Sequence, residues 1–91
     1  MMQKILVIVH LKGSSTLHYD AFSQALRHAG KHLLHERLHH FASVNESEIL
    51  IADVWKSAEV FSKYVDILMP LALENGFIPK AEINTLYQEL S

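Results

Sequence analysis

Asp53, Trp55 and His39 are the residues of this chain whose side chains could do chemistry together. Asp53 and Trp55 are two residues apart in the largely apolar segment 48–56, so they share one face if it is a strand. A carboxylate in an apolar strand needs a partner, or it must be protonated. An imidazole beside it forms a general base, and an indole ring stacks on planar ligands.

The partner of Asp53 depends on the register of a hairpin that closes through the polar break after Val44. In the simplest hairpin, Val44 pairs with Glu48 and His39 lies opposite Asp53. We therefore predict that His39, Asp53 and Trp55 form the catalytic group. A shift of one residue turns every side chain of a strand to the other face, and it presents His40 to Asp53 instead.

Each of these residues also has a purely structural interpretation. Trp55 can be a core aromatic at the end of a strand, as a small core requires. Asp53 can form an ion pair with His39, or with Arg37, which lies opposite Trp55 in the same register, and structural pairs of this kind are common. A Trp55 region that is packed solid would contradict the interpretation of the chain as an enzyme.

Three further residues are expected to line a ligand pocket. His10 ends the first predicted strand, where a pocket mouth could lie. Tyr64 and Phe61 lie on the apolar face of the helix that follows Trp55. An enzyme needs a polar group among apolar walls, and Tyr64, His10, His39 and Asp53 are the candidates.

The chain has seven histidines, and four of them raise the question of a metal site. On one continuous helix, His28, His32, His35 and His39 would form a single stripe able to bind zinc or nickel. Gly30 and the strand-like residues around His39 argue against that helix. In a strand, His35 and His39 are roughly 13 Å apart, too far to share an ion. We predict no metal site and no cofactor.

The hydrophobic pattern predicts the element order β-α-β-β-α-β. Gly30 is expected to end the first helix with a positive φ, and Pro70 to kink the second or end it near Met69. The predicted elements are strand 3–11, helix 17–29, strand 35–44, a break at 45–47, strand 48–56, a helix capped by Ser57 and closed by Gly76, and an edge strand 80–88.

This order is the ferredoxin-like α+β arrangement, in which an antiparallel sheet carries both helices on one face. The whole chain, residues 1–91, is expected to form one domain. The central strands are apolar on both faces, so the other sheet face would be left bare. Burial of that face against a second copy resolves the conflict, and we predict a homodimer.

Composition excludes several classes of protein. The chain has no cysteine, which rules out disulfides and thiolate metal sites, and 49% of its residues are hydrophobic. The net charge of −2, without a basic stripe, disfavours nucleic-acid binding. The longest apolar run, residues 5–9, is too short to span a membrane, and no signal-peptide pattern is present. We expect a cytoplasmic protein.

The join between the third strand and the second helix resembles a known superfamily. The residues that carry the resemblance are Asp53-Val54-Trp55-Lys56-Ser57, then Phe61, and the L-x-P-L…G pattern of Leu68, Pro70, Leu71 and Gly76. In these residues, and in the order of its elements, the chain resembles the dimeric α/β-barrel superfamily. It is most similar to the small antibiotic-biosynthesis-monooxygenase-like proteins.

The resemblance implies a homodimer whose two sheets face each other, with a pocket between helices and sheet in each subunit. Members include cofactor-independent oxygenases of quinol-type aromatics, in which the residue at Trp55 lies in the pocket. The haem-degrading branch needs a histidine ten residues after that Trp, where this chain has Val65. The resemblance therefore does not extend to haem ligation by that route.

The residues and the resemblance leave two hypotheses of function. In the first, the protein is a cofactor-independent monooxygenase of a small aromatic or quinol-type ligand. Trp55 holds the ring, and His39 or His10, tuned by Asp53, takes a proton from a phenolic hydroxyl. In the second, the protein is a non-catalytic ligand-binding or dimeric assembly module of the same fold. The sequence does not decide whether the chain is an enzyme.

Overall fold

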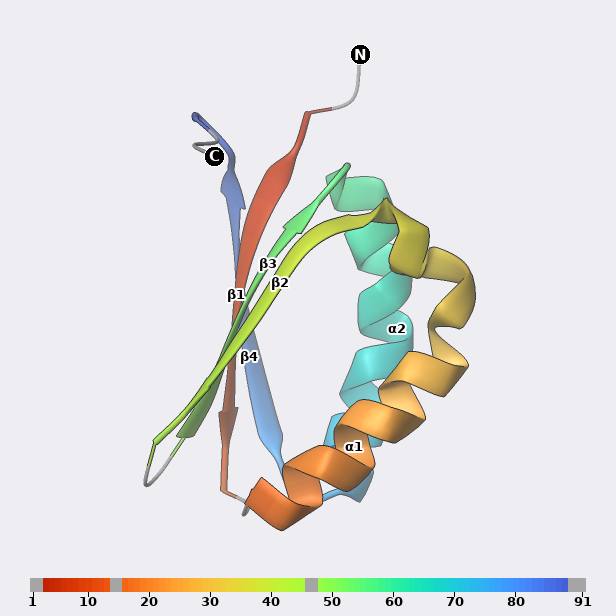
Figure 1. Ribbon diagram of the computed structural model, residues 1–91, viewed down its shortest axis with the longest axis vertical. Coiled ribbons are helices and arrows are strands. Elements are labelled where there is room, and N and C mark those ends of the chain that lie inside the picture. Colours follow the sequence, from red (N-terminus) through yellow and green to blue (C-terminus); the bar gives the residue numbers. More distant parts are fainter. Residues whose placement is uncertain (1–2, 14–15, 46–47, 89–91) are drawn as a thin grey trace.

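The computed structural model describes residues 3–13, 16–45 and 48–88. It contains the predicted order of strands and helices, with one short 3-10 helix added after the first helix (Figure 1). The elements are β1 (Ile5–Lys12), α1 (Thr16–Ala29), η1 (Lys31–Glu36), β2 (Arg37–Val44), β3 (Glu48–Trp55), α2 (Ala58–Glu74) and β4 (Ile78–Thr85).

The four strands form one antiparallel sheet in the order β2-β3-β1-β4. Both helices lie against the same face of this sheet (Figure 1). The predicted ferredoxin-like α+β fold is therefore confirmed, and β4 is an edge strand as expected. We call the face covered by α1 and α2 the helix face of the sheet, and the other face the open face.

The core lies between the helix face and the two helices. Alternate residues of β1 and β3 are buried there, as the burial of Val7, Val9 and Ile51 shows. Full burial of one such side chain contributes roughly 1.5–3 kcal/mol. The largest fully buried side chains are Trp55, Phe22, Phe61, Phe77, Leu11, Val7 and Val9.

The register of the β2–β3 hairpin differs from the prediction. Val44 pairs with Ile49 and not with Glu48, and the backbone N–H of Asn45 donates to the carbonyl of Glu48. Glu46 and Ser47 of the predicted break lie outside the described residues. A register shift between Arg37 and His39 takes up the one-residue difference, so that Arg37 lies opposite Trp55 as predicted.

Of the two outcomes that we expected at Pro70, a kink or an early end near Met69, the early end does not occur. The second helix continues to Glu74 because the side chains on both sides of the proline, Leu68 and Ala72, are buried, and this packing offsets the lost backbone hydrogen bond. The expected closing role of Gly76 is confirmed by its φ of 83°. The last strand runs from Ile78 to Thr85, earlier than the predicted 80–88.

Gly30 does end α1, but its φ is −99° and not positive. The chain passes from α1 straight into η1, so no left-handed residue is needed. The glycine relieves crowding instead: a Cβ at Gly30 would lie 3.0 Å from Cε1 of Tyr64, closer than an ordinary contact. The 3-10 helix also takes His35 out of the strand in which we had placed it.

None of the helices in the described ranges is both long enough and apolar enough to cross a membrane.

The cap of α2 gives a direct test of this local structure. Ser57 is 5% exposed, and its Oγ accepts a hydrogen bond from the backbone N–H of Val60 at 3.3 Å. We expect Ser57→Ala to lower the free energy of unfolding by about 1 kcal/mol in urea titrations. Ser62→Ala, on the exposed face of the same helix, is the control, because alanine favours helix there. Equal losses in both variants would contradict the capping role.

Candidate functional site

A small cavity lies between the helix face of the sheet and the inner sides of α1, η1 and α2. Its volume is about 30 Å³. A cavity of this size holds a water molecule, whereas pockets for drug-sized ligands measure roughly 300–1,000 Å³. The residues that line it are Val9, Tyr19, Phe22, Ser23, Leu26, Arg27, Leu34, Arg37, His40, Ile51, Asp53, Tyr64 and Leu68.

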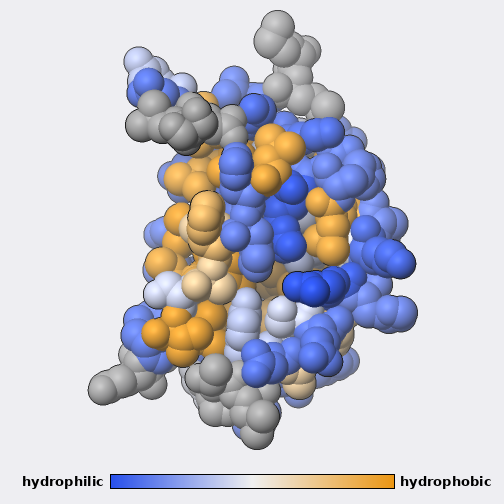
Figure 2. Space-filling view, viewed as in Figure 1, coloured by the Kyte–Doolittle hydropathy of each residue, from blue (hydrophilic) through white to orange (hydrophobic). Residues whose placement is uncertain are grey.

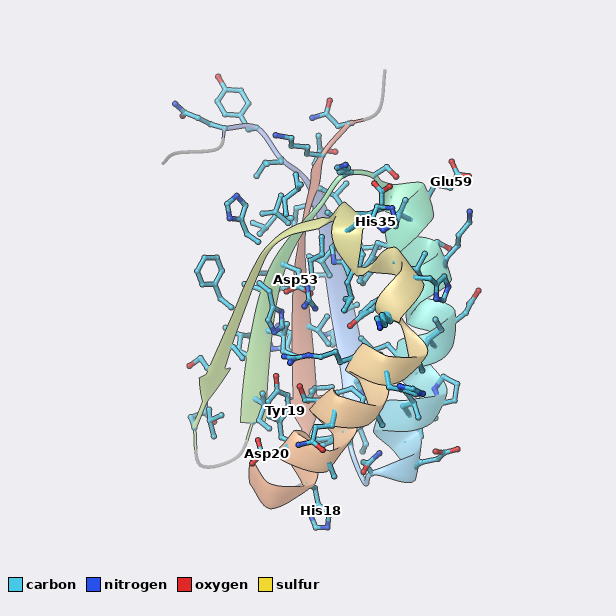
Figure 3. All side chains as sticks on the ribbon, turned by 45° about the vertical axis from the view of Figure 1, so that its right-hand side comes forward. His18, Tyr19, Asp20, His35, Asp53 and Glu59 are labelled. Carbon is cyan, nitrogen blue, oxygen red and sulfur yellow. The ribbon has the colours of Figure 1, made fainter. Side chains whose placement is uncertain are left out.

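The polar centre of this cavity is a carboxylate–imidazole pair. Oδ1 of Asp53 lies 2.5 Å from Nδ1 of His40, and the Asp53 side chain is 4% exposed while that of His40 is 35% exposed. Figure 3 shows Asp53 between the sheet and the helices, with Tyr19 beside the first turns of α1. In a neutral imidazole, a hydrogen bond from Nδ1–H to the carboxylate leaves Nε2 as the basic nitrogen. Nε2 has no hydrogen-bond partner among the described residues.

Two phenols, Tyr19 and Tyr64, lie beside this pair, and both are held in the neutral form. Burial raises the pKa of Tyr64 to about 12, although the guanidinium of Arg37 opposes the shift. Burial also raises the pKa of Tyr19. At neutral pH both hydroxyls can therefore donate a hydrogen bond to a ligand oxygen. Arg37 adds a positive charge at the same place.

His39 does not face Asp53, so its predicted place in the catalytic group is wrong. His39 pairs with Val54 and lies on the open face, while His40 pairs with Asp53. The cause is the one-residue shift of the β2–β3 hairpin. The alternative register, which presents His40, is the one observed.

Trp55 and Phe61 do not line the cavity either. Trp55 is 0% exposed, and its ring lies 4.6 Å from that of Tyr64 and 5.8 Å from that of Phe61, measured between centroids. It is packed on all sides, as its structural interpretation requires, and this packing contradicts the enzyme as we predicted it, in which Trp55 holds the ligand. Its Nε1 has no hydrogen-bond partner in the described part of the chain. Of the three pocket residues we predicted, only Tyr64 lines the cavity.

His10 lies on the open face and not at the mouth of the cavity. Its Nδ1 contacts Oε1 of Glu48, and its Nε2 lies 3.5 Å from Oε2 of Glu82. Together with Lys12 and Lys80, these residues line a separate surface hollow at one end of the sheet. The hydrogen bond to Glu48 raises the pKa of His10 against the effect of desolvation.

The histidines of the predicted helical stripe are spread over three elements. His28 lies in α1, His32 and His35 in η1, and His39 in β2. Within residues 3–13, 16–45 and 48–88, no group of three or more histidine, aspartate or glutamate side chains could hold a metal ion.

The sequence analysis did not assign Arg37, Tyr19 or Arg27 to the cavity, although all three line it. Arg37 was considered only as a structural partner of Asp53, and Tyr19 and Arg27 only as residues of the first helix. The spacing of residues on the helix could have identified Tyr19 and Arg27. Tyr19, Ser23 and Arg27 follow one another at intervals of four on α1 and therefore lie on one side of it. They border the apolar stripe of Phe22 and Leu26, where a helix meets the edge of its core.

No protein-family model matches this sequence, and no curated protein matches it either. Solved structures do match its fold. A protein of Caulobacter crescentus, assigned to the antibiotic biosynthesis monooxygenases, is 13% identical with a TM-score of 0.72, and the match covers 96% of this chain and 92% of that one.

Two other structures bear on assembly and ligand. A dimeric ferredoxin-like protein from an uncultured marine organism is 15% identical with a TM-score of 0.62, over 98% of this chain and 92% of that one. A monooxygenase of Streptomyces coelicolor, in complex with nanaomycin D, is 10% identical with a TM-score of 0.64, over the same shares. At such identities the likeness establishes the fold alone. The resemblance to antibiotic-biosynthesis-monooxygenase-like proteins is confirmed at that level.

The pairing of Asp53 predicts unequal effects of two neighbouring histidines on stability. His40→Ala leaves a buried carboxylate without its partner, and we expect a loss of about 1–3 kcal/mol in the free energy of unfolding. His39→Ala, its matched control on the open face, should cost less. Urea unfolding at neutral pH measures both. Similar losses would show that Asp53 does not depend on His40.

The raised pKa of His10 predicts a pH-dependent contribution to stability. A group whose pKa is raised by folding stabilises the fold below its ordinary value, near 6.5, and this contribution is lost as pH rises through the folded-state pKa. Wild type should therefore lose its advantage over His10→Gln between weakly acidic and alkaline pH. Urea unfolding of both proteins across that range measures the difference. A difference that stays constant with pH would contradict the prediction.

Proposed function

We propose that this protein is a homodimer that binds a small aromatic, quinol-type ligand in the cavity and oxidises it as a cofactor-independent monooxygenase. The observation that carries the proposal is the His40–Asp53 pair in a cavity that also has apolar walls, among them Val9, Phe22 and Ile51. Such a combination of apolar walls and one oriented base is typical of sites that remove a proton from an apolar substrate. The likeness to the monooxygenase with bound nanaomycin D supports the ligand class.

The chemistry assigns one step to each group. Nε2 of His40 takes the proton of a phenolic or enolic hydroxyl, and Asp53 stabilises the imidazolium that forms. The electron-rich anion, which keeps one hydrogen on the reacting ring carbon, then reacts with O2 at that carbon, and His40 returns its proton to the peroxide that forms. One oxygen atom becomes the new carbonyl. The other leaves as water with the proton from His40 and the remaining hydrogen of the carbon, so that His40 is neutral again. Tyr64 and Tyr19 donate hydrogen bonds to the oxygen of the anion.

The cavity must open before it can hold a ring, because its volume is about 30 Å³. The side chains that can move are on the β2 side. β2 has no fully buried residue, and Arg37 and His40 are both partly exposed, whereas the opposite wall contains the fully buried Phe22. A ligand would displace Arg37 and His40 towards solvent and leave the core in place.

The open face supports the proposed homodimer. Its centre is apolar and consists of Leu6, Ile8, Leu50, Ala52 and Val54, with Phe41 of β2 65% exposed beside them. In Figure 2, hydrophobic side chains gather mostly on the sheet side of the molecule and hydrophilic ones on the helix side. Exposed apolar patches of this kind mark interfaces, and one structural neighbour is a dimeric ferredoxin-like protein.

The alternative function is a non-catalytic ligand-binding or assembly module. The small volume of the cavity favours this alternative, because a site of about 30 Å³ does not admit an aromatic ring without rearrangement. In this alternative His40 only satisfies the charge of Asp53, and the open face carries the whole function of the protein.

Oxidation of anthrone to anthraquinone tests the enzyme hypothesis. Wild type should consume O2 and form anthraquinone faster than buffer alone. His40→Ala should lower kcat by roughly 100-fold or more, because a general base contributes that much. His39→Ala, which leaves the cavity intact, should keep the activity. A wild type no faster than buffer would favour the module, and equal activity in the two variants would remove His40 from the mechanism.

Native mass spectrometry tests the dimer. We expect a dimer for wild type and a monomer for Ile8→Asp, which places a charge at the centre of the open face. Leu73→Asp is the control, because Leu73 is 63% exposed on α2, on the helix side of the molecule. A monomeric wild type at micromolar concentration would contradict the assembly.

A further inference from the structure

We infer that the corner between α1 and η1 binds a negatively charged group, a carboxylate or a phosphate, carried by the ligand of the neighbouring cavity. This inference rests on the proposed ligand site and adds the charge of the ligand to it. The anion subsite is the groove lined by Gln24, Arg27, His28, Lys31 and Leu34.

Positively charged side chains are concentrated at this corner between α1 and η1. The chain as a whole has a net charge of −2, yet no aspartate or glutamate occurs between Asp20 and Glu36. The same stretch contains Arg27 and Lys31, together with three histidines. The corner is therefore positive on a protein that is negative overall, and such a local field attracts anions.

The carboxylate at the end of this stretch does not neutralise the groove. Glu36 is already occupied, since its Oε1 lies 3.1 Å from Nε2 of His35 and its Oε2 lies 3.9 Å from Nζ of Lys56. No carboxylate in the described ranges forms a salt bridge with Arg27 or Lys31. Both cations thus remain available to a ligand.

The groove has the shape of a subsite. It is an open depression with a volume of about 440 Å³, whereas the volume of the cavity is about 30 Å³. Its walls supply a guanidinium, an ammonium, an imidazole and an amide, which can all donate hydrogen bonds to an oxyanion, while Leu34 supplies apolar contact.

The groove and the cavity share a wall. Arg27 and Leu34 line both of them. A ligand whose ring enters the cavity between Leu34 and Tyr64 would therefore direct a substituent outwards past Arg27 into the groove. Arg37, inside the cavity, adds a second guanidinium along the same path. The arrangement selects an aromatic ring that carries an acidic group over a neutral one.

Arg27 and His28 also lie in the last turn of α1, where cations stabilise the helix dipole. This structural role does not account for Lys31, which follows Gly30 in η1 and lies against the same groove. The dipole effect also acts in the absence of ligand, so binding experiments separate it from the proposed role.

The test compares three naphthalenes with one ring system: 2-naphthoate, 2-naphthyl phosphate and the neutral 2-naphthamide. Calorimetric titration at low ionic strength should show that the anions bind about tenfold more tightly than the amide, because exposed charge-assisted contacts contribute only modestly to affinity. The preference should fall as salt is added. Whichever of the two anions binds more tightly identifies the acidic group.

Charge-neutral variants locate the subsite. In Arg27→Gln combined with Lys31→Gln, the anions should lose their tenfold advantage while the amide binds as in wild type. Lys63→Gln, on the exposed face of α2, is the matched control and should keep the preference. Anions that bind no better than the amide, or a preference that survives in the double variant, would overturn the inference.

Inorganic pyrophosphate separates this inference from the proposed function. In nitrogen–proton correlation spectra of the full chain, it should shift the backbone signals of residues 24–34 in wild type, and less in the double variant. Shifts without binding of any naphthalene would leave the subsite standing and contradict the aromatic ligand. Absence of shifts from both pyrophosphate and the naphthalene anions would overturn the subsite.

Discussion

The burial of one carboxylate constrains much of this structure. Asp53 is 3% exposed in a strand whose other helix-facing residues are apolar, so it must have a partner. His40 can reach it only if β2 pairs with β3 in the observed register, and that register places His39 on the open face. The irregularity between Arg37 and His39 then returns Arg37 to its position opposite Trp55. One buried charge is thus linked to the hairpin register and to the residues at the cavity.

The cavity exists because the two helices do not cover the whole sheet. α1 and α2 bury the helix face of β1 and β3, whereas no residue of β2 is fully buried. At the uncovered corner the polar groups His40, Arg37 and Tyr19 surround a space that the core side chains leave unfilled. Because the helices cover only part of the sheet, less apolar surface is buried than full coverage would bury. The same arrangement places titratable side chains where solvent and ligands can reach them.

The sequence predicted the larger features because they depend on burial alone. Hydrophobic periodicity located four strands and two helices, and Ser57 was correctly placed as a cap. The details that decide the site depend on a single residue of register. The parity of β2 reverses when the hairpin shifts by one position, so His39 and His40 exchange faces. The sequence also could not show whether Trp55 lies in the core or in a pocket wall, because both positions have the same hydrophobic pattern around the tryptophan.

The His40–Asp53 pair, which carries the proposed chemistry, also has a structural role. Asp53 needs His40 to be buried at all, whether or not the protein catalyses a reaction, and the fold by itself carries no activity. The cations beside the cavity bear on the charge of the proposed ligand. Arg27 and Arg37 line the cavity, and Lys31 lines the adjoining groove, although the chain has more acidic than basic residues. Their local field would attract an acidic group, which is the physical basis of the anion subsite inferred above.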